Sequence, residues 1–409
     1  MALAASAALT TLAGCGAGSP AVANRIAGDR LTVYESAPLH GASRVSAQAV
    51  IAGAQLALEQ ARNAVGRYHI AVKVLDDSTT QRGQWDPGQT TLVAHAAVAD
   101  KTTIAYIGDL NSGASAISIP ILNRAGIAQI TPASTAVGLT SDAPGAAPGE
   151  PAKYYPSGRR TYVRVVPNDT VQAAAMVELQ LQRGCRKTYV LDDGEFDGED
   201  TATTFELTAR PTRLQVIAVQ AFDPSTTDYS SLASSVAETG ADCVLISALA
   251  ENHAALLTAQ IAAALPKATI FGFAQLAQTT FTDPAKGGIP LQIDPRVLLT
   301  SPTLAPGATG RAAQAFWAAY GRRGGPLEPT AIFGYEAMKL LLDAIGRATG
   351  GGRRGAQRSK VIAALFATRD RHSSVGTYSI EPGGDTTLSR YGAYRVRAGR
   401  LVFWGAIDA

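Results

Sequence analysis

The chain has 409 residues, of which 46% are hydrophobic and 17% are charged, and its formal net charge is +3. This composition allows a large buried core and argues against wholesale disorder. The small net charge and the lack of a Lys/Arg stripe give no reason to expect nucleic acid as a partner. No apolar run reaches the ~18 residues of a membrane-spanning helix, and the length favours two or three domains of ~100–200 residues.

The chain opens with a short apolar segment that ends in the pattern "LAGC", whose last residue is Cys15. This pattern is typical of a bacterial lipoprotein signal, in which the cysteine receives diacylglycerol and becomes the mature N-terminus. We therefore expect residues 1–15 to be a signal peptide, residues 16–29 a tether, and Cys15 the lipidation site. Such a leader normally begins with Lys or Arg, so we expect the true start upstream of Met1. A chance cysteine in an alanine-rich start is the alternative.

Residues 31–133 alternate between strand-like and helix-like segments. We expect strands at 31–36, 69–77, 103–110 and 127–133, and helices at 46–65, 85–100 and 112–126. The second of these helices has Asp86 at its cap and Pro87 in its first turn, which is a typical helix start. Alternating strands and helices predict a parallel sheet with helices on both faces.

The same alternation repeats between residues 160 and 275, and a tail of three expected helices (309–322, 329–348 and 356–368) and closing strands follows. We predict an α/β fold of two doubly wound parallel-sheet lobes joined by a multi-strand hinge. Lobe one is expected to hold residues 30–164 plus 300–372, and lobe two residues 165–299 plus 373–409. Several crossings between lobes suit a clamshell that closes on a ligand.

One insertion, residues 141–161, is rich in Pro and Gly and is expected to be a loop. It carries Tyr154, Tyr155, Arg159 and Arg160. It is either a decorated surface loop or a lip over the cleft.

Apart from Cys15, the chain has only two cysteines, Cys185 and Cys243. One even pair is expected of an exported protein with a single disulfide. Each precedes a strand of lobe two, and the first and third strands of a doubly wound lobe are neighbours, so we predict a Cys185–Cys243 disulfide. Two separate buried thiols are the alternative. Without a CxxC motif or clustered histidines, we expect no metal site and no cofactor.

We find no GxSxG, phosphate-loop, HExxH or Cys-His pattern, so we expect a binding protein and not an enzyme. The stretches "IGDLNSGASA" (107–116) and "ITPASTA" (130–136) each follow the end of a strand, where α/β sheets bind ligands. Ser112 opens the next helix, whose free N–H groups suit a ligand carboxylate, and Thr135 offers a second hydroxyl. Both residues could instead serve only as caps.

These stretches, together with "RTYVRVVPND", "YESAPLHG" and "AIFGYEAMKLLLDAI", resemble the substrate-binding proteins of branched-chain amino acid ABC transporters, which have a type I periplasmic-binding fold. The resemblance runs from about residue 31 to the end. It implies that Ser112, Ala133 and Thr135 hold the α-carboxylate and α-amino group of a ligand. It also implies that Phe196 closes on the ligand from lobe two.

The sequence departs from the family pattern at several positions. His40 stands where Ser or Thr is common, and the turn "GFAQ" (272–275) has Ala274 or Gln275 in place of an acid that binds the ammonium group. A buried ammonium needs a counter-charge. Either Glu195, Asp197 or Glu251 supplies it, or the ligand is not a simple α-amino acid. The expected ligand-binding set is Ser112, Ala133, Thr135, Phe196, His40, Asn111, Ser134, Gln275 and Glu195.

The resemblance implies an extracytoplasmic, lipid-anchored monomer that captures a small polar solute and delivers it to the permease of an ABC importer. An amino acid of the branched-chain type is the leading ligand. An amide, urea or an aromatic acid is the alternative ligand, and a ligand sensor for a membrane signalling partner is the alternative role.

Overall fold

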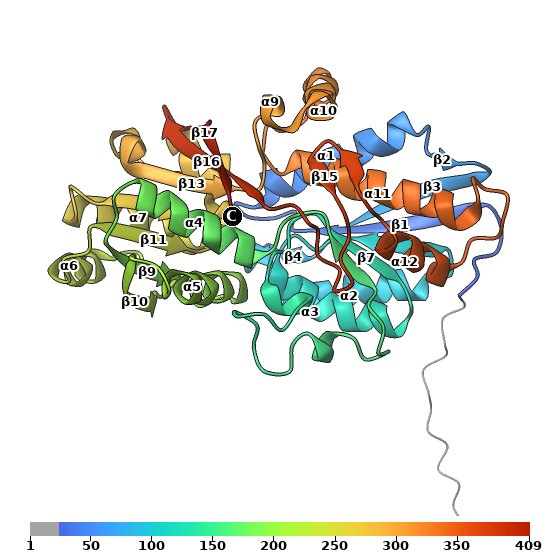
Figure 1. Ribbon diagram of the computed structural model, residues 1–409, viewed down its shortest axis with the longest axis horizontal. Coiled ribbons are helices and arrows are strands. Elements are labelled where there is room, and N and C mark those ends of the chain that lie inside the picture. The colour runs from blue at the N-terminus through green and yellow to red at the C-terminus, as the bar shows by residue number, and fades with distance from the viewer. Residues whose placement is uncertain (1–23) are drawn as a thin grey trace, which may run out of the picture.

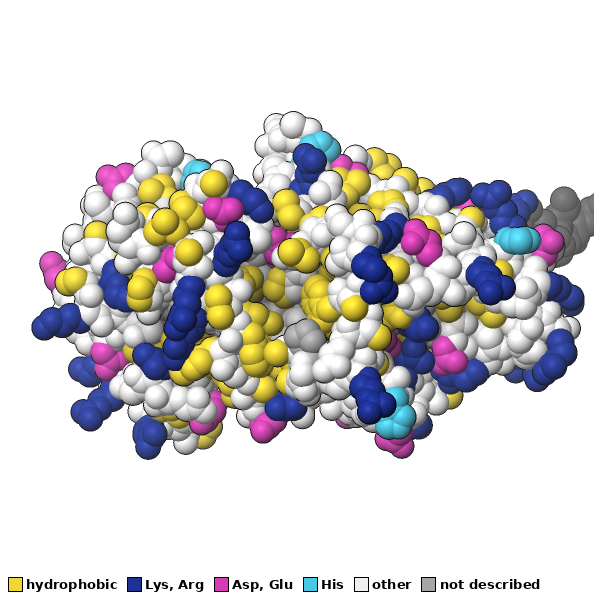
Figure 2. Space-filling view, turned by 90° about the horizontal axis from the view of Figure 1, so that it is seen from above, with side chains coloured by type: hydrophobic (Ala, Val, Ile, Leu, Met, Phe, Trp, Pro, Cys, Tyr) yellow, Lys and Arg dark blue, Asp and Glu magenta, His cyan; other side chains and the backbone are white. Residues whose placement is uncertain are grey.

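The computed structural model describes residues 24–409, apart from the side chain of residue 306, and has two lobes that lie end to end (Figure 1). The expected signal peptide with Cys15 and the first part of the tether fall outside the described residues. Within residues 24–409, no helix has both the length and the apolarity needed to cross a membrane. On the face seen in Figure 2, hydrophobic side chains gather near the middle of the molecule, where the lobes meet.

The first lobe is built on a six-stranded sheet in the order β2-β3-β1-β6-β7-β8, in which only the β2–β3 pair is antiparallel. The helix expected to reach residue 65 ends at Gln60, because Arg62 and Asn63 adopt positive φ and residues 64–65 pair with β3. The elements are β1 (Arg30–Ala37), α1 (Arg44–Gln60), β2 (Ala64–Val65), β3 (Tyr68–Asp76), α2 (Pro87–Ala99), β6 (Thr103–Ile107), α3 (Ser112–Arg124), β7 (Ala128–Thr131) and β8 (Tyr162–Arg164).

Three later helices complete the first lobe: α10 (Arg311–Arg323), α11 (Ala331–Thr349) and α12 (Arg358–Phe366). Helix α11 crosses α1 where a glycine of each helix meets the backbone of the other. A methyl group on Gly334 would lie 2.0 Å from the carbonyl oxygen of Val50, and one on Gly53 would lie 2.0 Å from that of Ala331. The two glycines therefore allow a close helix approach that any larger side chain would prevent.

The second lobe is built on a seven-stranded sheet in the order β10-β9-β11-β12-β13-β16-β17. The first five strands in this order are parallel, and the last two form an antiparallel hairpin, so the sheet is mixed. The two-lobed α/β prediction is confirmed. The elements are α4 (Asp169–Gln182), β9 (Lys187–Asp192), α5 (Phe196–Ala209), β10 (Gln215–Ala221), α6 (Ser230–Glu238), β11 (Cys243–Ser247), α7 (Ala255–Ala264), β12 (Thr269–Gly272), β13 (Val297–Ser301), β16 (Arg390–Arg397) and β17 (Arg400–Asp408).

The last crossing between lobes comes later than expected. Strands β14 (Arg371–Ser373) and β15 (Gly376–Tyr378) pair with each other, and Tyr378 and Ile380 lie in the core of the first lobe. The expected return to lobe two at residue 373 is therefore corrected, because the chain re-enters the second sheet only at β16. Short elements are β4 (Ser78–Thr79), β5 (Gln84–Trp85), α8 (Thr279–Thr282) and α9 (Pro306–Thr309).

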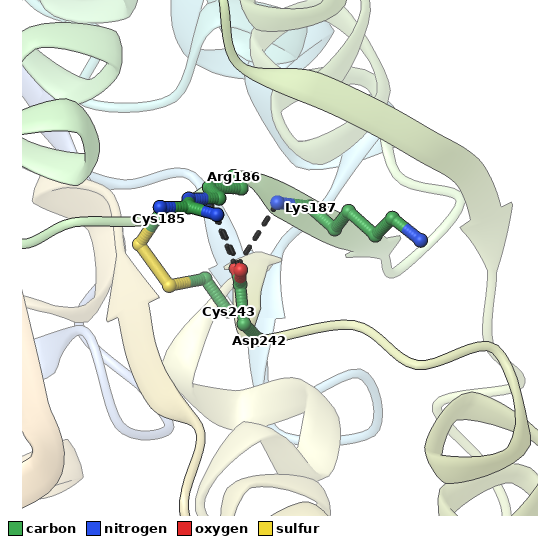
Figure 3. Close-up of a disulfide and its surroundings, with 5 residues drawn as sticks. All are labelled: Cys185, Arg186, Lys187, Asp242 and Cys243. Atoms are coloured by element: carbon green, nitrogen blue, oxygen red, sulfur yellow. Dashed lines mark hydrogen bonds between the residues drawn. A yellow bond between two sulfur atoms is a disulfide. The ribbon is translucent and has the colours of Figure 1, made fainter.

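Cys185 and Cys243 form a disulfide in the second lobe, with their Cα atoms 5.9 Å apart (Figure 3). Cys243 begins β11, which pairs with β9 just after Cys185, so the bond forms between neighbouring strands as predicted. The Asp242 carboxylate accepts hydrogen bonds of 3.1 Å from the backbone N–H groups of Arg186 and Lys187. Among the described residues, Cys185, Asp242 and Cys243 are the one group of potential metal ligands, and these contacts already engage their ligand atoms.

Candidate functional site

A cavity of about 100 Å³ lies between the two lobes. On the first-lobe side part of its wall comes from the loops after β6 and β7, which are adjacent parallel strands. Ligands of open α/β sheets bind at this carboxyl edge, and the volume suits a small molecule. The wall includes Ser43, Ser46, Leu110, Asn111, Ala133 and Thr135 from lobe one, and Asp197, Leu249, Gln275 and Gln278 from lobe two.

Ser112 and Ser134 lie behind this wall and hold its two loops together. The Ser112 hydroxyl accepts hydrogen bonds of 3.1 Å from the backbone N–H groups of Thr135 and Ala136. The Ser134 hydroxyl donates to the carbonyl oxygen of Asp109 at 2.9 Å. Both serines are buried and neither lines the cavity. Of the expected first-lobe residues, the structure thus places Asn111, Ala133 and Thr135 on the wall.

Asp197 of the second lobe reaches the N-terminus of α3 in the first lobe. Its Oδ1 atom accepts a hydrogen bond of 2.7 Å from the Ser112 N–H group, and its Oδ2 atom accepts one of 3.4 Å from the Gly113 N–H group. The side chain is 6% exposed, and burial raises the pKa of Asp197 to about 7, although these two hydrogen bonds oppose the shift. The carboxylate therefore occupies the place that we expected for an anionic group of the ligand.

Phe196, one residue earlier, points elsewhere. Its ring packs against a buried cluster of the first lobe that includes Tyr154, Tyr155 and Ile119, and it does not line the cavity. The insertion at 141–161 is therefore a packed loop whose tyrosines are buried, and Phe196 contacts it from the second lobe. The residue that faces the cavity from the start of α5 is Asp197.

Gln275, which we expected to bind the ligand, lines the second-lobe wall. Its Nε2 atom donates a hydrogen bond of 3.2 Å to the hydroxyl of Thr201, which fixes the orientation of the amide. Its Oε1 atom is buried and has no hydrogen-bond partner among the described residues. A buried acceptor without a partner is costly, so a ligand that donates a hydrogen bond would be stabilised here.

His40 and Glu195 do not line the cavity. The His40 ring lies 2.8 Å from the Asp76 carboxylate, and its side chain is 44% exposed. The Glu195 carboxylate accepts hydrogen bonds from the side chains of Arg82 at 3.1 Å and Gln84 at 3.2 Å, both of which belong to the first lobe. Glu195 therefore joins the lobes outside the cavity.

Two further contacts join the lobes at the cavity and involve residues outside the expected ligand-binding set. The Ser43 hydroxyl donates to the Glu251 carboxylate at 2.9 Å, and the Ser46 hydroxyl donates to the Gln278 side chain at 3.2 Å. Burial raises the pKa of Glu251 to about 7. Ser43 and Ser46 follow the end of β1, so the strand-end rule that singled out Thr135 also applies to them.

Arg164 at the end of β8 supports the loop that carries Thr135. Its guanidinium donates to the carbonyl oxygens of Ser134 at 3.1 Å and Ala136 at 2.9 Å, and it lies 2.8 Å from the Asp385 carboxylate. The Arg164 side chain is fully buried. No local pattern indicates this role, because Asp385 lies far along the chain.

The wall is acidic. Among the described residues that line the cavity, Asp197 is the one ionisable side chain, and none is Lys, Arg or His. The remaining polar wall groups are hydroxyls and side-chain amides, with apolar surface from Leu110 and Leu249. This arrangement can bind a small polar molecule, and we find no group placed to act as a nucleophile.

Comparisons with known proteins agree on the fold. The leucine-binding protein LivK of Thermotoga maritima is 21% identical, with a TM-score of 0.79 over 92% of this chain and 99% of that one. LivJ of Streptococcus pneumoniae, solved with isoleucine, is 17% identical, with a TM-score of 0.75 over 93% and 99%. A Rhodopseudomonas palustris solute-binding protein, solved with p-hydroxybenzoic acid, is 16% identical, with a TM-score of 0.76 over 93% and 98%.

These relatives are substrate- or solute-binding proteins. A search of curated proteins finds no match. The family model described as "Periplasmic binding protein" matches residues 36–399, nearly the whole described chain. The chain therefore belongs to the periplasmic binding protein family, as its motifs and its two-lobed fold indicated.

Proposed function

We propose that this protein is the extracytoplasmic receptor of an ABC importer, and that it captures a small polar solute between its lobes and delivers it to the permease. The observation that carries the proposal is the cavity between the lobes, whose wall combines the strand-end loops of lobe one with Asp197 and Gln275 of lobe two. Membership in the periplasmic binding protein family supports a location outside the cytoplasm.

Binding follows from the two walls. The open clamshell receives the solute on Asn111, Ala133 and Thr135, and lobe two then closes with Gln275 and Asp197. The solute stabilises the closed form because only that form makes both sets of contacts. The closed form is the one that docks on the permease, and no covalent bond is made or broken.

An amino acid of the branched-chain type is the leading solute, because the wall adds Leu110 and Leu249 to its polar groups. Asp197 supplies the counter-charge that an ammonium group needs, because it lines the cavity and Glu195 does not line it. Amides, urea and aromatic acids are the alternative classes. A ligand sensor would use the same clamshell, and neighbouring genes for a kinase instead of a permease and an ATPase would favour it.

The solute is found by a thermal-shift screen of amino acids, amides, urea and aromatic acids, with calorimetry on each positive compound. A solute at 100 times its dissociation constant stabilises the protein by ~2.7 kcal/mol, which is readily measured. Thr135→Val should weaken binding about 10- to 150-fold if its hydroxyl bonds a charged group. Gln275→Ala should mainly speed dissociation, because lobe two closes after the encounter.

The matched control is Thr91→Val, which removes an exposed hydroxyl of α2 that bonds only its own helix, at Pro87. This variant should bind as the parent does. If no compound of the screen shifts the parent, or if Thr135→Val and Gln275→Ala both bind with the parent's affinity and rates, the proposed site is wrong.

We also propose that Cys15 anchors the protein to the membrane. The pattern "LAGC" supports this assignment. Mass spectrometry of the native protein should show a diacylglyceryl cysteine at the N-terminus. An unmodified chain that still contains residues 1–14 would contradict it.

A further inference from the structure

We propose that Asp197 sets the chemical class of the solute. Its carboxylate accepts hydrogen bonds from the N–H groups at the start of α3, so these groups are not available to a solute carboxylate. The site therefore binds solutes that donate hydrogen bonds, as amides and amines do, and rejects solutes whose only polar group is a carboxylate. This inference rests on the proposed function and deepens it. Of the classes named above, it favours amides, urea and the ammonium group of an amino acid over aromatic acids.

The first step of the argument is geometric. A helix N-terminus attracts anions because its first N–H groups lack partners within the helix. At α3 those of Ser112 and Gly113 already donate to Asp197, at 2.7 and 3.4 Å. The Ser112 hydroxyl is also engaged, because it accepts from the N–H groups of Thr135 and Ala136. The positions that would bind a solute carboxylate are therefore filled from within the chain.

The second step concerns charge. A solute carboxylate beside Asp197 would place two acidic groups next to each other, and no Lys, Arg or His of the described wall would offset their charge. To reach the N–H groups it would have to displace Asp197, which is 6% exposed and would lose both hydrogen bonds. Removing the partners of a buried charge is strongly destabilising.

The third step concerns the groups that remain available. Gln275 has a buried Oε1 atom with no partner among the described residues, and the Asp197 carboxylate is a second acceptor on the wall. An ammonium or amide group donates to such acceptors without displacing anything. The wall is thus complementary to a donor. A site for an acid such as p-hydroxybenzoic acid, which is bound in one structural relative, would instead need free hydrogen-bond donors for the carboxylate.

The test uses acid and amide pairs with the same skeleton: isocaproate and isocaproamide, benzoate and benzamide, acetate and acetamide. Leucine and leucinamide are added as an acid and amide pair in which both compounds carry an ammonium group. Calorimetry on the parent should show at least one amide or amine that binds at least about tenfold tighter than its acid. In Asp197→Ala the N–H groups of Ser112 and Gly113 at the start of α3 lose their partner. The affinity for the acid should therefore rise at least about tenfold relative to the affinity for its amide.

Glu251→Gln is the matched control. Glu251 is also a buried carboxylate of the second lobe, but it accepts from Ser43 and not from α3. Its substitution removes a nearby charge and leaves the α3 N–H groups occupied, so the acid-to-amide ratio should change less than in Asp197→Ala. Circular dichroism and the melting temperature establish that each variant is folded. If Asp197→Ala does not fold, Asp197→Asn replaces it and should still shift the ratio more than Glu251→Gln.

Three outcomes would overturn the inference. The parent could bind an acid as tightly as its amide, Glu251→Gln could shift the ratio as far as the Asp197 variant, or no amide or amine could bind at all. In the last case, binding of any other compound in the broad screen would leave the proposed function standing. If nothing in either screen binds, the proposed function fails as well.

Discussion

Removal of the Cys185–Cys243 disulfide should lower the free energy of unfolding of the second lobe by about 4 kcal/mol. The bond closes a loop with a sequence separation of 58 residues. This size lies between loops of 15 and 100 residues, for which the chain-entropy relation gives about 3 and about 4.7 kcal/mol at 25 °C. The bond also lies beside the starts of the adjacent strands β9 and β11, and the loop that it closes includes α5, β10 and α6, a large part of that lobe.

The assay compares three samples in urea: the oxidised parent, the parent treated with a reductant, and the Cys185→Ser/Cys243→Ser double variant. The unfolding midpoint is followed by circular dichroism, and hydrogen exchange of β9 and β11 is compared with that of β1 and β6. The reduced parent and the double variant should agree with each other and should unfold at a lower urea concentration than the oxidised parent. The loss of protection should be concentrated in the second lobe.

The reduced parent serves as a control for the serine substitutions, because it loses the bond but keeps both side chains. If the oxidised parent and the double variant unfold at the same urea concentration, the loop argument fails. If labelling of the unreduced, denatured parent finds free thiols at Cys185 and Cys243, the bond itself is absent.

Three other predictions follow from buried groups of the first lobe. Burial raises the pKa of Glu35 to about 8. The free energy of unfolding should therefore fall as the pH rises from about 4.5 to about 8, and this group contributes up to about 5 kcal/mol to the fall. Glu35→Gln should remove that part of the pH dependence of the urea midpoint. Asp385→Asn leaves the Arg164 guanidinium buried without its counter-charge, so it should lower the free energy of unfolding by about 3–5 kcal/mol. Equal melting temperatures of this variant and the parent would refute the prediction. Gly334→Ala places a methyl group 2.0 Å from the Val50 carbonyl oxygen and should cost about 1–3 kcal/mol, whereas Gly405→Ala, where a methyl group meets nothing, should cost less.

The sequence alone determined the features that depend on neighbouring residues. The alternation of apolar strands and helices predicted two α/β lobes, and the strand-end loops singled out Ser112 and Thr135, of which Thr135 lines the cavity and Ser112 lies behind its wall. The number and placement of Cys185 and Cys243 predicted the disulfide. These predictions hold because periodicity and strand order are set by local spacing and by the few topologies that parallel sheets allow.

Only the tertiary structure decided which side chains face the cavity. Phe196 and Asp197 are consecutive in the sequence, and successive helix residues point about 100° apart, so the rotation of α5 against its neighbours selects one of them. His40 contacts the carboxylate of Asp76, and Arg164 pairs with Asp385. The segment after residue 373 packs in the core of the first lobe. Each of these outcomes depends on a partner distant in the chain, which meets the residue only in the folded lobe, so no local pattern contains it.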